Sequence, residues 1–126
     1  MSDTDEAARA AGFGHGELVY LQIPSADLES SARFYASVLD WHVEVGKAGF
    51  EAPGLIGQWV TDRAIAADAG SLLWFAIENL GAALENAVST GGVVVDQPYA
   101  DGPVRTLATV SDPSRNLLGL VHHQPA

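Results

Sequence analysis

Four histidines are the side chains of this 126-residue sequence best suited to proton transfer or metal binding. His122 and His123 are adjacent, and neighbouring residues of a strand point to opposite faces, so the two cannot serve one mononuclear site without a bend. His42 follows Trp41 in a predicted strand. We expect each histidine to be structural or solvent-facing. The alternative is a site between subunits that combines His15 and His122.

An arginine near two acids is the next candidate for polar chemistry. Arg105 follows residues Gln97 to Pro103, which we expect to form a loop, and Asp96 and Asp101 lie beside or within that loop. A guanidinium can hold a ligand carboxylate through a forked pair of hydrogen bonds, with the loop acting as a lid. A surface ion pair of Arg105 with Asp96 or Asp101 is the simpler interpretation.

Other signatures of catalysis or cofactor binding do not emerge from the sequence. It contains no cysteine, and therefore no thiol nucleophile, disulfide or thiolate metal site. No Ser-His-Asp order is apparent, and the glycines at residues 12–16 precede a strand, whereas those of a dinucleotide-binding loop follow one. The net charge of −10 and the six scattered Lys and Arg residues argue against a nucleic-acid partner. We expect no cofactor.

Composition and length predict one compact domain with its own core, since 48% of the 126 residues are apolar. No apolar run approaches the roughly 20 residues of a membrane span. The acidic N-terminus lacks the basic-then-apolar order of a secretory signal. We therefore expect a cytoplasmic protein without a membrane partner. Residues 1–16, poor in bulky apolar side chains, are predicted to be an appendage to a domain at 17–126.

A pattern that occurs twice supplies the elements that must position these side chains. Residues 19–41 and 73–94 each read as an apolar strand, a turn, an amphipathic helix and the start of another strand. With the residues that follow, module one (17–63) and module two (71–123) both read βαβββ. A unit that cannot bury its apolar face alone stacks on its twin, and the seam between them is a natural place for a ligand.

The individual elements follow from periodicity and capping. A helix is predicted at Leu28–Leu39 after an Asp27 N-cap, and a second at Leu80–Ser89, where Gly91-Gly92 stops it. Strands are predicted at residues 17–24, 41–45, around 50, 55–60, 71–77, 93–96, 104–110 and 117–123. The chain thus reads as α+β.

The order of these phrases resembles the vicinal oxygen chelate superfamily, which includes glyoxalase, bleomycin-resistance and extradiol dioxygenase proteins. In module one the resemblance rests on residues 23–27, 34–35 and 39–41, and in module two on residues 82–84, 91–92 and 112–120. Arg115 departs from the family pattern, whose turn usually carries glycine there. The resemblance implies two βαβββ modules that form a curled mixed sheet around one cleft, commonly in a homodimer.

In metal-dependent members of that superfamily, four inward-facing strand positions carry His, Glu or Gln. By the resemblance, these positions hold Tyr20, Gly57, Trp74 and Gly119 here. Two glycines and an indole offer a metal no side-chain donor, and a lone tyrosine would have to ionise far from its free pKa of about 10. We therefore predict a metal-free site in which Tyr20 and Trp74 stack a planar ligand above an open floor. The alternative is that these residues only fill space.

Strand alternation suggests which side chains share the cleft with Tyr20 and Trp74. Steps of two lead to Gln22, Trp59 and Ala76 within a mostly apolar lining, and they put Gln58 on the helix side. The predicted ligand-binding residues are therefore Tyr20, Gln22, Gly57, Trp59, Trp74, Ala76, Arg105 and Gly119.

The leading hypothesis is a glyoxalase/bleomycin-resistance-like protein that binds an apolar or aromatic small molecule in a metal-free cleft. The first alternative is a lyase, isomerase or dioxygenase-like enzyme, with Tyr20 as a weak candidate for acid–base catalysis or with metal ligands at non-standard positions. The second alternative is a structural or regulatory dimer with a vestigial pocket.

Overall fold

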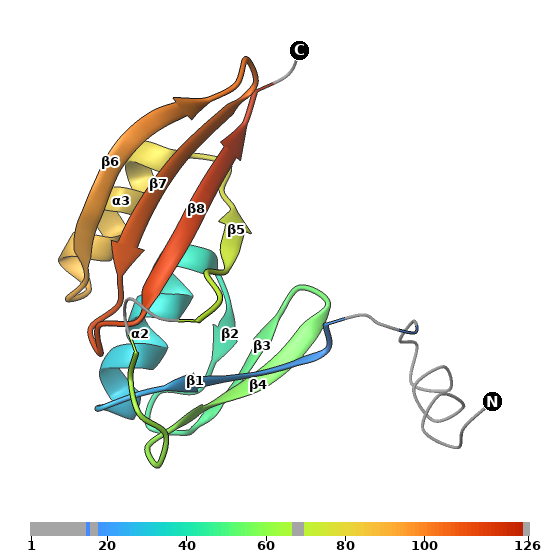
Figure 1. Cartoon of the computed structure of the whole chain (residues 1–126). Helices are drawn as coiled ribbons and strands as arrows, with labels where there is room; N and C mark the ends of the chain where they lie inside the picture. The colour runs from blue at the N-terminus through green and yellow to red at the C-terminus, as the bar shows by residue number, and fades with distance from the viewer. Residues whose placement is uncertain (1–14, 16–17, 67–69, 125–126) are drawn as a thin grey trace.

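The computed structural model of the chain describes His15 and residues 18–66 and 70–124 (Figure 1). Within the predicted appendage only His15 is described, and it is exposed. The rest of residues 1–16 lies outside the described residues. Neither helix in the described part of the chain has the length and apolar character that a membrane span requires.

Module one forms a four-stranded mixed sheet with one helix. Its elements are β1 (Tyr20–Pro24), α2 (Leu28–Leu39), β2 (His42–Val43), β3 (Gly49–Ala52) and β4 (Leu55–Val60). The strand order is β1-β4-β3-β2, with β1 parallel to β4 and the other pairs antiparallel.

Module two repeats this arrangement. Its elements are β5 (Trp74–Ala76), α3 (Leu80–Ser89), β6 (Val93–Asp101), β7 (Arg105–Ser111) and β8 (Leu117–His123). The strand order is β5-β8-β7-β6, and β5 runs parallel to β8. The α+β class and the two βαβββ modules are therefore confirmed.

The predicted single curled sheet is not formed within one chain. The described strands make two separate sheets, in which β1 and β5 each pair on one side only. Figure 1 shows the sheets as distinct bodies, with α2 and α3 next to each other at their junction. The two open sheet faces therefore do not close around a common cleft in a monomer.

Both helices start and stop as the sequence predicts. Asp27 caps α2 by accepting a hydrogen bond of 3.2 Å from the Ser30 amide, and Asn79 caps α3 by accepting one of 3.0 Å from the Ala82 amide. The helix α2 ends at Asp40, which adopts a left-handed conformation with φ of 57°.

An aromatic cluster fills the core between α2 and the first sheet. Tyr35 stacks on Trp41 with ring centroids 5.0 Å apart, and Trp41 stacks on Phe50 at 4.6 Å. Trp59 packs against Phe50 at 4.8 Å, and Phe34 meets Tyr35 edge-on at 5.3 Å. Burial of these rings supplies much of the apolar stabilisation of module one.

The turn between β7 and β8 joins the two modules. The Asn116 Nδ2 donates to the Pro24 carbonyl at 2.6 Å, and the Ala26 amide donates to the Ser114 Oγ at 2.8 Å. Arg115 occupies the left-handed region with φ of 74°, the conformation for which glycine is usual in this turn. The turn at residues 112–116, which is part of the family resemblance, thus connects the two modules through hydrogen bonds.

The segment predicted to be a lid is part of a strand. Residues 97–101 continue β6, and β6 forms a hairpin with β7 instead of a loop above a cleft. Pro98 is accommodated because β6 is an edge strand, where a missing N–H need not break the ladder. Register shifts occur between Val94 and Asp96 and between Asp96 and Tyr99, which hid the strand from a simple alternation pattern.

Candidate functional site

The strands β1 and β4 present two different faces. Tyr20, Gln22, Ile56 and Gln58 are exposed on the face away from the helices, with Tyr20 at 46% and Ile56 at 56% of full exposure. The register pairs Tyr20 with Ile56 and Gln22 with Gln58, so these four side chains adjoin one another. We call this surface the open face of module one.

The predicted position of Trp59 was wrong, because it lies on the helix side. Its side chain is only 1% exposed and packs against Phe50 and Tyr35. Gly57 faces the same way, and a Cβ there would lie 2.1 Å from the Leu21 carbonyl oxygen and 2.3 Å from the Phe50 ring. The absence of a side chain at Gly57 therefore makes room for the Phe50 ring in the core. It does not open the floor of a ligand cleft.

A shift of one residue explains both misplacements. The β1–β4 register places Ile56 opposite Tyr20, just as the β5–β8 register places Gly119 opposite Trp74. Ile56, and not Gly57, is therefore the structural counterpart of Gly119. A one-residue slip turns every side chain of a strand to its other face. The same shift moves Gln58 from the predicted helix side to the open face.

In module two, Trp74 and Gly119 share the open face. The indole lies directly over Gly119, where an added Cβ would approach the ring to 2.2 Å. Trp74 remains 40% exposed, and Ala76 is exposed beyond it on the same strand. The Trp74 ring thus packs on the backbone of Gly119 and remains partly exposed.

The cross-strand row continues from Trp74 and Gly119 through Thr109 to Asp96. The buried Thr109 donates a hydrogen bond of 2.6 Å from its hydroxyl to the Asp96 carboxylate. Sequence reasoning missed Thr109 and Ile56 as neighbours of the aromatic residues. Only the correct strand pairing would have identified these neighbours, and that pairing depends on contacts between residues far apart in the sequence.

The polar groups near Tyr20 are few. Gln22 Nε2 donates to the Tyr20 hydroxyl at 3.2 Å, on an exposed part of β1. The tyrosine hydrogen remains available to a ligand acceptor, because the bond to Gln22 uses only an oxygen lone pair. The open face of module one can therefore orient a ligand through an amide and a phenol.

Arg105 is held at the far end of β7. Its guanidinium lies 2.9 Å from the Asp101 carboxylate, and both side chains are about half exposed. The surface ion pair that was the simpler interpretation is present. Arg105 pairs with His123 across the strands, so it lies well along the sheet from Trp74 and Gly119.

The histidines are dispersed in the described part of the chain. His42 is exposed opposite Glu51 in β3, and His122 Nδ1 lies 3.0 Å from the Ile77 carbonyl oxygen. No group of three or more His, Asp or Glu side chains that could hold a metal ion occurs within the described residues. The side chains at the four equivalent strand positions, Tyr20, Ile56, Trp74 and Gly119, do not form a donor set suited to a divalent metal.

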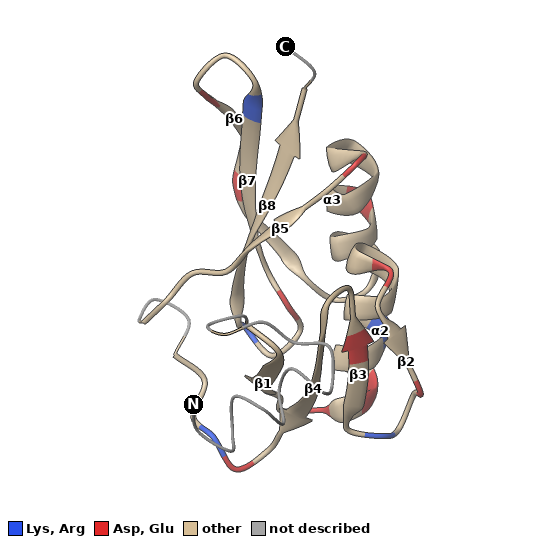
Figure 2. Ribbon diagram, turned by 90° about the vertical axis from the view of Figure 1, so that its right-hand side faces the viewer, with Lys and Arg blue, Asp and Glu red and all other residues tan. Residues whose placement is uncertain are grey.

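The strands β1, β4, β5 and β8 contain no Asp, Glu, Lys or Arg, and the charged side chains near them on the open faces include Glu51, opposite Ile56, and Asp96, opposite Thr109. The 22 such residues of the chain all lie elsewhere, and Figure 2 shows these strands free of charged colouring. Uncharged strands with exposed apolar side chains suit contact with an apolar ligand or a protein surface.

Comparisons with known proteins agree with this architecture. No protein-family model and no curated protein matches the chain. A glyoxalase/bleomycin resistance protein from Albidiferax ferrireducens is similar in structure, with a TM-score of 0.68 and 21% identity over 84% of this chain and 98% of that one. A glyoxalase-related enzyme from Fulvimarina pelagi has a TM-score of 0.69 and 18% identity, covering 86% of this chain and 88% of its own.

A glyoxalase/bleomycin resistance protein/dioxygenase family enzyme from Burkholderia phytofirmans also has a TM-score of 0.69, with 17% identity over 86% of this chain and 99% of that one. The chain therefore has the glyoxalase/bleomycin-resistance fold, and the resemblance to the vicinal oxygen chelate superfamily is confirmed in its fold.

Proposed function

We propose that the protein binds a planar, apolar small molecule on its open sheet faces, with Tyr20 and Trp74 as stacking surfaces. The observation that carries the proposal is the placement of Trp74 over the bare backbone of Gly119. Tyr20 occupies the equivalent position of module one and is similarly exposed. At two of the four positions where metal-dependent relatives of the superfamily present ligating side chains, this chain presents aromatic rings.

Two such rings would add stacking to the apolar area that a small ligand buries. Stacking of an aromatic pair contributes about 0.5–1.5 kcal/mol beyond the burial of its apolar area. The net charge of −10 repels anionic molecules at long range, so the preferred ligand is neutral or cationic. Gln22 and the Tyr20 hydroxyl supply the polar contacts that fix its orientation.

We further propose that the site is completed in a homodimer. Tyr20 and Trp74 belong to separate sheets, and both side chains are exposed among the described residues. Leu18, Tyr20 and Ile56 on module one and Leu72 and Trp74 on module two are large apolar residues exposed at 37–56%. Apposition of module one of one copy with module two of the other would cover these apolar side chains and enclose the ligand between two rings.

Phenazine, a neutral planar tricycle, provides a direct test. Trp41 and Trp59 are buried, so Trp74 is the one exposed tryptophan among the three, and a ligand stacked on it should quench its emission. Trp74→Ala should weaken binding, followed by phenazine absorbance, about tenfold or more. Trp74→Phe, the matched control, should lose the quenching and keep most of the affinity. Equal affinity of wild type and Trp74→Ala would exclude the proposed platform.

A further inference from the structure

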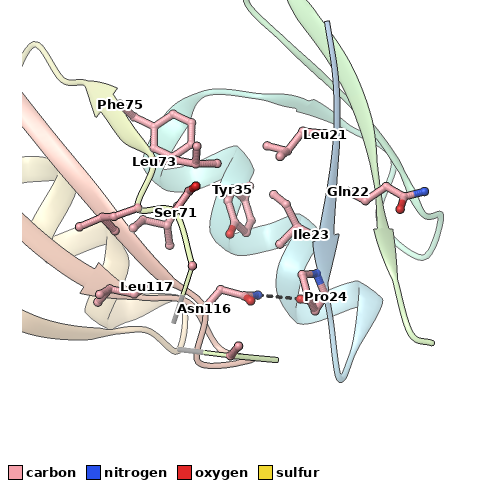
Figure 3. A pocket seen from close by; sticks show the side chains of 14 residues that line it. Leu21, Gln22, Ile23, Pro24, Tyr35, Ser71, Leu73, Phe75, Asn116 and Leu117 are labelled. Atoms are coloured by element: carbon pink, nitrogen blue, oxygen red, sulfur yellow. Dashed lines mark hydrogen bonds between the residues drawn. The ribbon is translucent and has the colours of Figure 1, made fainter. Parts of the chain in front are cut away.

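A cavity lies at the seam between the modules, on the helix side of the sheets. It has a volume of about 360 Å³. Figure 3 shows it between β1 and the segment that leads into β5, with Tyr35 of α2 behind it and Asn116 at one end. Both modules therefore contribute to its wall.

The lining of this seam pocket combines apolar side chains with uncharged polar groups, which include Ser71 and Asn116. Leu21 and Ile23 come from β1, Leu73 and Phe75 from the β5 segment, and Leu117 from β8. Among the described residues that line it, none is Asp, Glu, Lys, Arg or His. An uncharged wall of this kind leaves an ionic ligand without a counter-charge, so it selects neutral molecules.

At the end of the pocket near Asn116, the Asn116 and Tyr35 side chains offer acceptors. Asn116 Nδ2 donates to the Pro24 carbonyl at 2.6 Å and to the Asp112 carboxylate at 2.8 Å, which fixes the amide orientation and leaves its Oδ1 without a donor among the described residues. The Tyr35 hydroxyl donates its hydrogen to Asp112 at 2.9 Å. A ligand group facing these atoms must therefore bring its own N–H or O–H.

The seam pocket and the open faces use opposite sides of the same strands. Leu21 and Ile23 alternate with Tyr20 along β1, and Leu73 and Phe75 flank Trp74. Gln22 borders the pocket, but its side chain points away from it in Figure 3. A molecule in the pocket would thus leave both proposed stacking rings free.

From these observations we infer that the seam pocket is a separate binding site for a neutral, apolar molecule carrying one hydroxyl or N–H group, which it directs at Asn116 Oδ1. The volume lies near the lower end of the roughly 300–1,000 Å³ of small-molecule sites, so a molecule of one or two ring systems fits best. Because the ligand contacts both modules, its binding should raise the melting temperature of the whole domain.

The test uses N-phenyl-1-naphthylamine, a neutral probe with one N–H whose fluorescence increases in apolar surroundings. Leu73→Trp fills the pocket from its wall and should weaken probe binding about tenfold or more. The control Trp74→Ala changes the open face next to it and should leave the affinity within about twofold. Loss of binding in Trp74→Ala with retention in Leu73→Trp would overturn the inference and place the probe on the open face.

Methyl NMR keeps the test independent of the folding of Leu73→Trp. In the wild-type protein, the probe should shift the methyl signals of Leu21, Leu73 and Leu117 and leave those of Leu18 and Ile56 in place. The reverse pattern, or no saturable shift, contradicts the inference. Failure of phenazine to bind would leave this result untouched, so the two proposals fail separately.

The acceptor end is tested with 1-benzylnaphthalene, in which a methylene replaces the N–H. It should displace the naphthylamine probe with an affinity lower by a factor of about 2–10, the equivalent of one neutral hydrogen bond. Equal affinities would show that Asn116 does not select a donor.

Discussion

The Tyr35 hydroxyl donates a hydrogen bond of 2.9 Å to the Asp112 carboxylate, although the two residues are 77 positions apart. Tyr35 lies on α2 of module one, and Asp112 begins the turn of module two. Both are buried, and burial is the main cause that raises the pKa of Tyr35 well above 10.0 and that of Asp112 above 3.8. This bond joins the modules through their interior.

Tyr35→Phe should therefore destabilise the whole domain by about 1–3 kcal/mol, because Asp112 loses a buried donor. Chemical denaturation measures the free energy of unfolding. Tyr99→Phe, at an exposed tyrosine of β6, is the matched control and should change it by less than about 0.5 kcal/mol. Equal effects of the two substitutions would show that the inter-module bond carries no stability.

The pH dependence of stability should reveal Asp112. Its folded pKa is raised, so the folded state binds its proton more tightly than the unfolded chain does. The contribution of this group is therefore fully present below its ordinary value of 3.8 and is lost as the pH rises through the raised folded pKa. The difference in unfolding free energy between wild type and Asp112→Asn should decrease with rising pH in that window. An increase would mean that hydrogen bonding outweighs burial.

Gly57→Ala should destabilise the protein by about 1–3 kcal/mol, the usual effect of overpacking a core. The new methyl would meet the Leu21 carbonyl oxygen at 2.1 Å, and backbone cannot move aside cheaply. Gly49→Ala on the adjoining strand is the control, because nothing lies within 4 Å of its added Cβ. Thermal unfolding of the two variants should differ clearly; similar melting temperatures contradict the packing described.

Gly119→Ala should change ligand binding more than stability. Its methyl would approach the Trp74 ring to 2.2 Å, but this side chain is partly exposed and can rotate away. We expect a red-shifted tryptophan emission, phenazine affinity reduced about tenfold, and less than about 1 kcal/mol lost in unfolding free energy. Unchanged phenazine binding would show that the indole need not lie over the backbone.

Ile56→Glu should convert the proposed dimer to monomer, because it adds a second carboxylate beside Glu51 at the interface, where burying a charge is costly. Val88→Glu is a matched control on α3, since Val88 and Ile56 are exposed to nearly the same extent, at 58% and 56%. Light scattering after size-exclusion chromatography gives the mass of each variant. A wild-type monomer, or dissociation by Val88→Glu alone, would refute the proposed arrangement.

Local signals made the helices predictable from the sequence. Asp27 with the stripe that follows, and the Gly91-Gly92 stop, gave bounds of α2 and α3 that the structure reproduces. Both depend on side chains within a few positions of each other. The internal repeat and the family resemblance likewise predicted the fold. They also identified Trp74 as the position in module two that is equivalent to Tyr20 in module one.

Strand pairing and the contacts between modules were harder to predict from the sequence. The assignment of Gly57 and Trp59 depended on a register that the chain sets through tertiary packing, and one position of error reversed the faces. The Tyr35–Asp112 bond and the seam pocket join residues from both halves. No periodicity within either half records such contacts.

The edge strands β2 and β6 differ in length and regularity, and each is a poor template for the addition of a strand from another chain. Strand β2 has only two residues, while β6 carries Pro98 and two register shifts. Neither offers the long, regular row of amide and carbonyl groups that an incoming chain needs to extend a ladder. We therefore expect little strand addition at the β2 and β6 edges when the protein is concentrated.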